Sequence, residues 1–254
     1  MPRSANSPNV KTSSVGGYWR QSRRPLTSLV FVLPLLLVYE GGVLALGPSA
    51  VRNGADVWLR HLLNLSGFGE YFLLPLLTVA ALLAWHHLTH EPWKISLPVL
   101  YVMLLESICF GLLLLVIAQF QARALAMAGS GSPSFAVLSL GEVIGNWLGR
   151  LVTYFGAGIY EEVMFRLLLL PLLYGAAKVA GVAQKRDRAV IAVLLSSLAF
   201  SAAHYLGPAG EAFDLFSFCF RFSAGAFFAV VFVLRGFGIA AGAHAAYDIF
   251  VGLF

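Results

Sequence analysis

Long apolar runs dominate the pattern of hydrophobic and polar positions in this chain. In runs that are this apolar, periodicity does not separate helix from strand, but length does. A strand of a membrane barrel needs only about 10 residues and alternates in polarity, whereas about 20 residues at 1.5 Å each cross a bilayer core of about 30 Å as a helix. We therefore expect an all-α, polytopic transmembrane helix bundle, with helices at about 26–46, 70–89, 96–119, 158–180, 189–206, 213–234 and 237–254.

The segment 140–157 leaves the number of membrane helices open at seven or eight. Its polar residues Glu142, Asn146 and Arg150 recur every four positions, so they share one face of a helix. Such a helix either crosses the membrane with this face inward or lies in the interface as an amphipathic helix. If this segment does not cross, there are seven membrane helices and the charges of the connections agree with a cytoplasmic N-terminus; if it crosses, there are eight and one connection violates the charge rule. Both alternatives stay open.

Composition supports the membrane assignment and excludes other classes of protein. Of the 254 residues, 59% are hydrophobic and only 11% are charged, whereas a soluble domain carries about 25% charged residues. So few charges do not coat a water-facing surface, which excludes a soluble globular enzyme, a disordered chain and a nucleic-acid-binding module. The net charge of +5 comes from basic residues at the ends of the apolar runs, which fits membrane topology.

These terminal charges also predict which side of the membrane each connection faces. Residues 1–25 are rich in Ser, Asn, Pro and Gly and contain basic residues but no acid, which indicates a flexible tail on the cytoplasmic side. The connection 181–188 is basic and is also assigned to the cytoplasm. The connection 207–212 contains Glu211 and no base, so it is assigned to the opposite side.

Ionisable residues in the first half of the chain have simple structural explanations. Glu106 lies in the middle of an apolar run, and a hydrogen bond to a neighbouring helix is its expected role. Glu40 lies near a helix end, where its carboxylate is expected to form hydrogen bonds with water or a neighbouring helix. His86 and His87 lie near the end of their helix and are expected in the membrane interface.

Three motifs in the second half place further ionisable residues on three separate expected helices. They are EEVMFR from Glu161 to Arg166, FSAAH ending at His204, and HAAYD from His244 to Asp248. An ionisable group in a membrane segment is energetically costly, so each is a candidate site residue. Each motif alone is weak evidence, but no packing requirement explains all three together.

Spacing within the motifs separates the roles of their residues. Glu161 and Glu162 are neighbours whose side chains diverge by about 100° on a helix, so we expect different tasks for them. Glu162 and Arg166 are four residues apart on one face and can form a supporting ion pair, which leaves Glu161 free for proton transfer. His244 and Asp248 are also four apart, so the carboxylate can orient the imidazole.

This set of residues is suited to hydrolysis. A carboxylate near an imidazole can deprotonate water, and a second polar pair can stabilise the oxyanion that forms when water attacks an amide. Alternatively, His204, His244 and a carboxylate hold a zinc ion that activates the water. The zinc motif HExxH and the serine nucleophile motif GxSxG are both absent from the sequence.

In their order along the chain, the three motifs resemble those of the CPBP family. This family comprises CAAX proteases and bacteriocin-processing intramembrane proteases, and is also called the Abi family. Its pattern is EExxxR, then FxxxH, then HxxxN or HxxxD on successive membrane helices. The resemblance covers roughly residues 135–254 and implies that this part is the catalytic helix bundle, preceded by a tail at 1–25 and a variable set of transmembrane helices at 26–134.

The resemblance also implies a role for each motif residue. Glu161 activates water together with His204, and Glu162 and its arginine form the supporting pair. His244 and Asp248 support the oxyanion or complete a metal site, for which Glu161, His204, His244 and Asp248 are the candidate ligands. Zinc, another divalent metal and metal-free water activation all stay open. The family's Asn is replaced by Asp248 here, and an ionised Asp cannot donate a hydrogen bond, which favours orientation of the histidine or metal ligation.

The implied function is hydrolysis of a peptide bond in a membrane-associated or lipidated protein or peptide, by an intramembrane protease with or without a metal. Eukaryotic prenyl proteases of the family remove a C-terminal tripeptide after a prenylated cysteine. The expected partners are such a substrate and the lipid bilayer, with no nucleic acid, in a bacterial plasma membrane with the N-terminus in the cytoplasm. The alternatives are a non-catalytic membrane immunity or scaffold protein, against which the intact motifs argue, and a proton-coupled transporter, for which no inverted repeat is seen.

Helix lengths predict that Glu161 and His204 meet. Glu161 is expected near the start of helix 158–180, which leads into the basic connection, and His204 near the far end of helix 189–206, which leaves it. Both residues then lie at the same level of the membrane. Because basic connections face the cytoplasm, Glu161 and His204 are expected toward the non-cytoplasmic leaflet. The resemblance to prenyl proteases with cytosolic substrates favours the cytoplasmic side instead.

Overall fold

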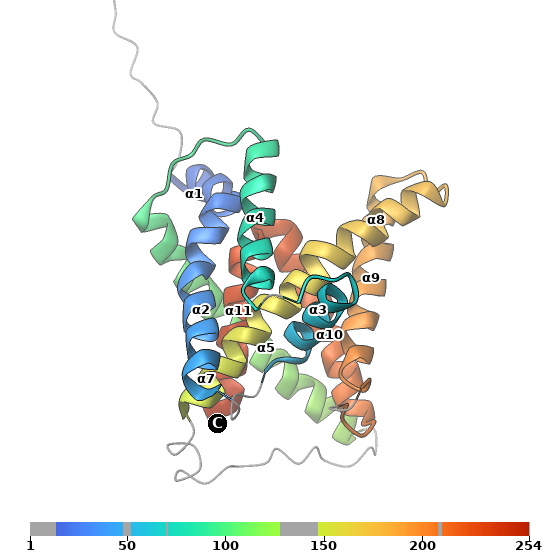
Figure 1. The fold of residues 1–254 in the computed structure, drawn as a ribbon. Coiled ribbons are helices and arrows are strands. Elements are labelled where there is room, and N and C mark those ends of the chain that lie inside the picture. Colours follow the sequence, from blue (N-terminus) through green and yellow to red (C-terminus); the bar gives the residue numbers. More distant parts are fainter. Residues whose placement is uncertain (1–13, 48–51, 70, 128–146, 208–209, 254) are drawn as a thin grey trace, which may run out of the picture.

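The computed structural model describes residues 14–47, 52–69, 71–127, 147–207 and 210–253, and within these ranges every regular element is a helix (Figure 1). The expected all-α fold is therefore confirmed for the described residues. In chain order the helices are α1 (Ser14–Ser22), α2 (Pro25–Leu46), α3 (Gly54–Leu65), α4 (Leu73–Leu88), α5 (Leu97–Met127), α7 (Trp147–Gly156), the π-helices η2 (Ala157–Glu161) and η3 (Val163–Leu169), α8 (Leu170–Val179), α9 (Lys185–Ala203), α10 (Leu215–Arg235) and α11 (Phe237–Leu253).

Three of the described helices, α2, α5 and α10, are long and apolar enough to cross a membrane. α4 is apolar but has only 16 residues, and α11 has 17. α9 has 19 residues, but its first turn, from Lys185 to Arg188, is charged. The expected number of seven or eight membrane helices is therefore not confirmed, because length and apolar composition coincide in only three helices of the described ranges.

The helix that carries Glu161 begins earlier than expected. α7 continues through η2 and η3 into α8 without a break, since the residues at all three junctions have helical backbone angles. The described part of the segment 140–157 is thus the beginning of this helix, so Glu161 lies in its interior and not near its start. Of the expected polar face, Arg150 lies on α7, while Glu142 and Asn146 lie outside the described residues.

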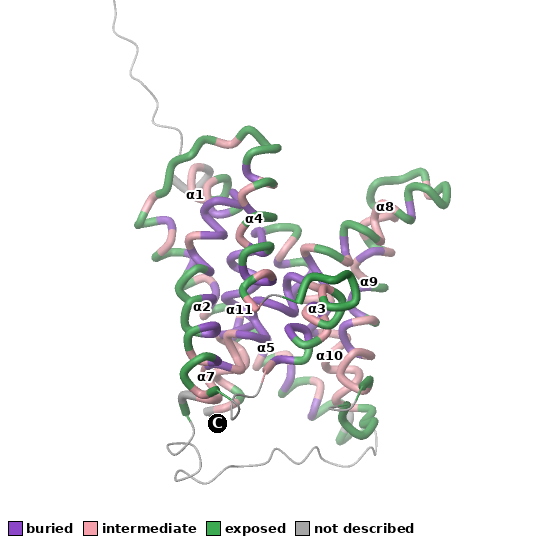
Figure 2. Tube along the Cα trace, viewed as in Figure 1, coloured by how far each residue is buried: buried purple, intermediate pink, exposed green. Residues whose placement is uncertain are grey.

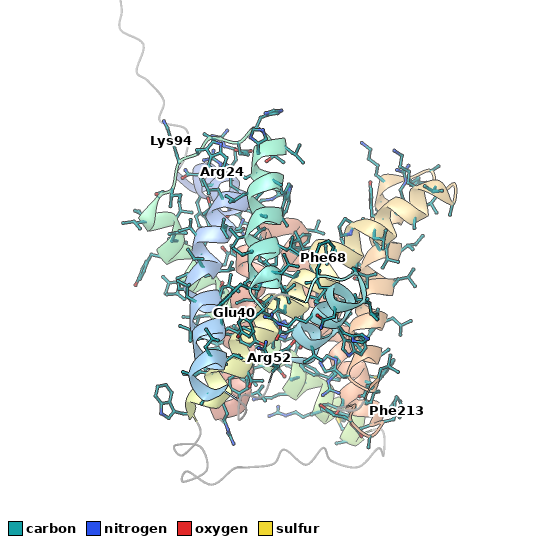
Figure 3. All side chains as sticks on the ribbon, viewed as in Figure 1. Arg24, Glu40, Arg52, Phe68, Lys94 and Phe213 are labelled. Carbon is teal, nitrogen blue, oxygen red and sulfur yellow. The ribbon has the colours of Figure 1, made fainter. Side chains whose placement is uncertain are left out.

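The basic segments gather at one end of the bundle. α1 and the start of α2 lie at the same end as the connection between α8 and α9 (Figure 1), and Arg24 and Lys94 are seen at this end in Figure 3. The arrangement agrees with the assignment of both segments to one side of the membrane. That this side is the cytoplasm stays a prediction.

The expected flexible tail is helical from Ser14 onward, where it forms α1. The reason is a set of aromatic contacts that composition does not reveal. The Tyr18 hydroxyl donates to Glu106 on α5, and the guanidinium carbon of Arg235 lies 3.7 Å from the ring centre of Trp19. Arg235 in turn binds Glu106 at 2.5 and 2.7 Å, which confirms the expected structural role of Glu106 and ties α1, α5 and α10 together.

α11 is the central helix of the bundle. It packs against α5, α2, η2 and α10, and residues such as Phe237, Ile239 and Ala240 are completely buried; Figure 2 shows the buried segments gathered in the middle of the bundle. Small residues allow this close approach. A Cβ atom on Gly242, for example, would lie 2.6 Å from Ser107 Oγ on α5. The N-terminal helices and the motif-bearing helices therefore share one hydrophobic core.

Candidate active site

The contact between η2 and α11 positions the first and third motifs against each other. A Cβ atom on Gly158 would lie 2.7 Å from the Ala241 carbonyl oxygen and 2.9 Å from the Ala245 backbone nitrogen, so the two backbones touch there. π-helices are rare and occur frequently at functional sites. Here two π-helical stretches flank Glu162, and the register differs from that of the α-helix assumed in the sequence analysis.

His244 lies between three carboxylates. Its Nδ1 is 2.9 Å from Glu162 Oε1, and its Nε2 is 3.7 Å from Glu161 Oε2 and 3.8 Å from Asp248 Oδ2. Both neighbouring glutamates thus reach the same imidazole, from opposite ring nitrogens, although the sequence analysis expected them to act apart. The imidazole is oriented by the hydrogen bond that Nδ1 donates to Glu162, since Asp248 is farther away. The Phe228 ring stacks on the imidazole with a centroid separation of 4.4 Å, so the ring plane is fixed as well.

The ion pair expected between Glu162 and Arg166 is present and fully enclosed. Arg166 Nη1 is 3.1 Å from Glu162 Oε1, and the exposed fractions of the side chains are 1% and 0%. Arg166 also donates from Nη2 to the Gly225 carbonyl at 3.1 Å, and its guanidinium lies 4.5 Å from the centre of the Phe200 ring. Glu162 Oε1 therefore serves both the arginine and His244, so the pair holds the histidine in position.

A residue from outside the three motifs holds Glu161. Asn53 donates from Nδ2 to Glu161 Oε1 at 2.7 Å, while its Oδ1 accepts from the backbone nitrogen of Ala55 at 2.8 Å and caps the N-terminus of α3. One side chain thus begins α3 and fixes one carboxylate oxygen of Glu161. The other oxygen, Oε2, stays on the side of His244.

A polar network anchors α3, and with it Asn53, to α2. Asp56, which is fully buried, accepts from the Tyr39 hydroxyl at 2.8 Å, from Arg52 at 2.8 Å and from Arg60 at 2.6 Å. Arg60 continues to Glu40 at 3.1 Å, so Glu40 is satisfied by a neighbouring helix, as expected. Figure 3 shows Glu40 and Arg52 beside α3 in the middle of the bundle. Burial lowers the pKa of Arg52, but its hydrogen bond and ion pair with Asp56 outweigh that effect and raise it, so Arg52 stays positively charged.

His204 follows directly on α9 and faces a cavity that it shares with Glu161. Its Nδ1 lies 2.8 Å from the Phe200 carbonyl oxygen, so this nitrogen carries the donated hydrogen and Nε2 is the acceptor of the neutral ring. The cavity has a volume of about 340 Å³, and Asn53 and Trp58 also line it. The structure therefore brings Glu161 and His204 to one cavity, and Glu161, Glu162 and Asp248 around His244, with Glu161 common to both groups.

The candidate metal ligands do not form a ready metal site. Within the described ranges, no three His, Cys, Asp or Glu side chains are grouped so that they could hold a metal ion. His204 lies at the cavity, whereas His244 has Nδ1 engaged by Glu162 and Nε2 facing Glu161 and Asp248. We therefore derive no catalytic step through a metal.

The comparison with known families identifies the part of the chain that contains these motifs. Residues 143–250 match the family described as "Type II CAAX prenyl endopeptidase Rce1-like". This part of the chain is an Rce1-like domain. The match contains all three motifs and confirms the resemblance to the CAAX protease family; together with the apolar helices, it indicates a CAAX-type endopeptidase that is integral to the membrane. Comparisons with curated proteins and with solved structures gave no match.

Part of the site lies outside the Rce1-like domain, in residues that none of the three motifs contains. The segment from Asn53 to Asp56 carries a signal for the start of a helix, because Asn is a preferred N-cap and an acidic residue follows in the first turn. That signal predicts α3, but it does not predict the contact with Glu161, which joins residues 108 positions apart. Asn53 and the network on α2 and α3 therefore complete the Rce1-like site from the N-terminal half.

Proposed function

We propose that the protein is an intramembrane endopeptidase that hydrolyses a peptide bond in a membrane-associated or lipidated peptide, with Glu161 and His204 activating the water. The observation that carries this proposal is the cavity that these two residues share. They come from different motifs of the Rce1-like domain, and each offers an acceptor for a proton of water. A cavity of about 340 Å³ accommodates a water molecule together with part of a peptide chain.

The proposed first step is attack of this water on the amide carbonyl carbon. Water donates one hydrogen bond to Glu161 and one to Nε2 of His204, so that its lone pair is directed at the carbonyl. As the carbon–oxygen bond forms, Glu161 takes the proton. Asn53 holds Oε1 of this glutamate at 2.7 Å, which fixes the carboxylate for the transfer.

The proposed second step is collapse of the tetrahedral intermediate. In its imidazolium form, His244 offers an N–H from Nε2 to the developing oxyanion, while Glu162 and Asp248 hold and balance it. The carbon–nitrogen bond then breaks as the leaving nitrogen takes the proton from Glu161, which releases an amine and a carboxylic acid. The buried pair of Glu162 and Arg166 takes no part in the bond changes and supports the histidine.

The experiment compares purified protein and variants in proteoliposomes that contain a synthetic peptide ending in a farnesylated cysteine and three further residues. Released tripeptide is quantified by mass spectrometry, with the unprenylated peptide as a second substrate. Loss of general-base catalysis reduces rates by about 10²–10⁴-fold, so we expect losses of this size for Glu161→Gln and His204→Gln. Asp187→Asn and His87→Gln make the same chemical changes at the surface and should keep the wild-type rate.

Two results would contradict the proposal. Near-wild-type turnover by Glu161→Gln or His204→Gln would remove that residue from the mechanism. Wild-type protein that cleaves neither peptide would refute a C-terminal prenylated peptide as its substrate.

A further inference from the structure

A second cavity, of about 450 Å³, lies at the basic end of the bundle and shares no lining residue with the active-site cavity. It is formed by α1, the start of α2, and the C-terminal part of α4 with the residues that follow. We call it the arginine pocket. Its main lining residues are Trp19, Arg20, Arg23, Arg24, Trp85 and Glu91.

The arginine pocket carries excess positive charge. Its only lining acid is Glu91, which lies 2.9 Å from Arg24 Nε and neutralises that guanidinium. No acidic side chain in the described part of the chain forms an ion pair with Arg20, and none forms one with Arg23. Arg23 donates from one nitrogen to the Val233 carbonyl at 3.3 Å, which leaves its remaining N–H groups available. Two positive charges are therefore uncompensated in one cavity.

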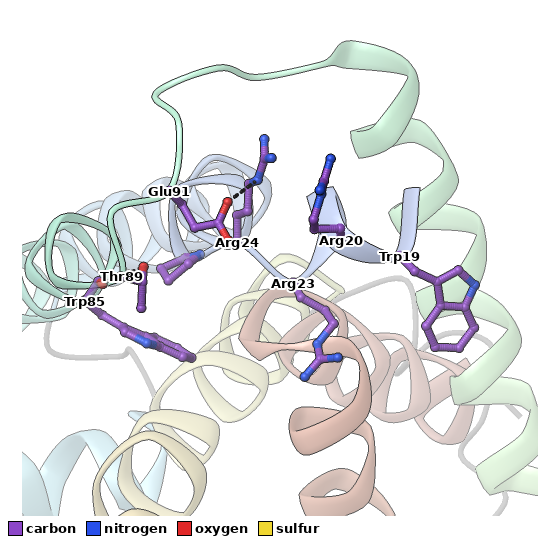
Figure 4. A pocket seen from close by; sticks show the side chains of 8 residues that line it. Trp19, Arg20, Arg23, Arg24, Trp85, Thr89 and Glu91 are labelled. Atoms are coloured by element: carbon purple, nitrogen blue, oxygen red, sulfur yellow. Dashed lines mark hydrogen bonds and ion pairs between the residues drawn. The ribbon is translucent and has the colours of Figure 1, made fainter. Parts of the chain in front are cut away.

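The aromatic walls of the pocket are held by contacts that belong to the fold. Trp19 stacks on Arg235, which Glu106 fixes from α5, and the Trp85 ring packs against Phe232 at a centroid distance of 6.2 Å. Figure 4 shows the Arg23 side chain extending between these two tryptophans, while Arg20 and Arg24 extend to the other side. Contacts within the protein thus hold the walls of the pocket, and its arginines extend in two directions.

Position and residue types together indicate the chemistry of the ligand. Tryptophan is enriched where the bilayer meets water, because its ring is apolar and its N–H is polar. Arginine offers a planar fork of N–H donors that matches phosphate oxygens and stays charged in a partly buried site. An arginine between two tryptophans, at the start of the apolar helix α2, therefore lies where the phosphate of a membrane lipid is found.

We propose that the arginine pocket binds the phosphate group of an anionic phospholipid. Arg23, which extends between the two tryptophans, binds the phosphate oxygens, and Arg20 adds a second uncompensated positive charge on the other side of the pocket. The rings of Trp19 and Trp85 pack against the glycerol and the first part of the acyl chains. Free phosphate has the same charged oxygens, but it would leave these aromatic walls without a partner. This site is independent of the proposed peptidase reaction.

The experiment uses the full chain in a neutral detergent and follows tryptophan fluorescence, since Trp19 and Trp85 line the pocket. Three probes are titrated: dioctanoyl-phosphatidylglycerol, dioctanoyl-phosphatidylcholine and inorganic phosphate. We expect phosphatidylglycerol to bind most tightly. Arg23→Gln should weaken it about tenfold, because charge-assisted hydrogen bonds to phosphate are lost. Arg20→Gln should weaken it less, because only the attraction of an uncompensated positive charge is lost. Arg186→Gln removes the same charge at the same end of the bundle, from a side chain that is 84% exposed, and should leave the affinity unchanged.

Each other outcome overturns a defined part of the proposal. Equal weakening by Arg186→Gln and Arg23→Gln would show attraction to the whole basic end and no site. Equal affinity for the two lipids would remove the requirement for net negative charge. If inorganic phosphate binds as tightly as phosphatidylglycerol, the ligand is a soluble phosphate and the proposed binding of a lipid is refuted. If Arg23→Gln does not fold, Arg20→Gln decides the result, because its exposed side chain has no ion-pair partner in the described structure.

Discussion

Replacement of Asn53 by Ser tests how Glu161 is held. Serine is also a good N-cap, so α3 should still begin at this position, but the Nδ2 donor that lies 2.7 Å from Glu161 Oε1 is lost. A hydrogen bond to a charged group contributes about 1.5–3 kcal/mol. If this energy orients the carboxylate for proton transfer, kcat should fall roughly tenfold to a hundredfold, at about 1.4 kcal/mol per factor of ten. Turnover of the farnesylated peptide in proteoliposomes measures the effect.

Asn53→Ala is the matched variant. It loses the same donor and also the cap, so its kcat should fall as in Asn53→Ser, while the free energy of unfolding decreases by about 1 kcal/mol more. Thermal unfolding of the three proteins in detergent separates the two effects. Wild-type kcat in Asn53→Ser, with folding intact, would refute the idea that Asn53 positions Glu161.

Three further predictions follow from other parts of the structure. Glu162→Ala leaves its arginine partner buried and unpaired, so stability should fall by about 3–5 kcal/mol, measured by chemical unfolding; a stable but inactive Glu162→Gln would instead show that this residue acts through its contact with His244 and not through the stability of the fold. Gly158→Ala introduces a Cβ against the α11 backbone and should cost about 1–3 kcal/mol in the same assay, whereas Gly175→Ala meets no atom within 4 Å and should not destabilise. In a variant without the two native cysteines, a cysteine at Gln184 should resist an impermeant reagent in intact cells and one at Ala212 should react; the reverse pattern would invert the predicted orientation.

Much of the fold could be predicted from the sequence because long apolar runs have one solution in a bilayer. The expected helices at 26–46 and 213–234 nearly coincide with α2 and α10. The sequence fails where helix boundaries depend on neighbours. No residue pattern around Glu161 marks where its helix begins, so the sequence does not show that α7 and the following π-helices form one continuous helix. α1 was missed because its stability comes from contacts with α5 and α10 and not from its own composition.

The residues of the candidate site could be predicted from the sequence, but the contacts between them could not. Order and type of the motif residues were sufficient to choose Glu161, His204 and His244, and the i, i+4 spacing was sufficient for the ion pair of Glu162. The spacing rule assumed an α-helix, however, and in the π-helical region both glutamates reach His244. A contact such as that of Asn53 is set by the packing of distant helices, which no local pattern contains.

The contact of the α3 N-cap residue with Glu161 has a consequence for exchanging parts of this chain with other proteins. A side chain from the N-terminal half holds a carboxylate of the Rce1-like domain, so the two halves of the chain depend on each other for this contact. A chimera that joins the Rce1-like domain to N-terminal helices without an amide at this place would keep all three motifs and lose the side chain that holds Glu161. The three motifs alone therefore do not define the complete candidate site, because one of its contacts comes from α3.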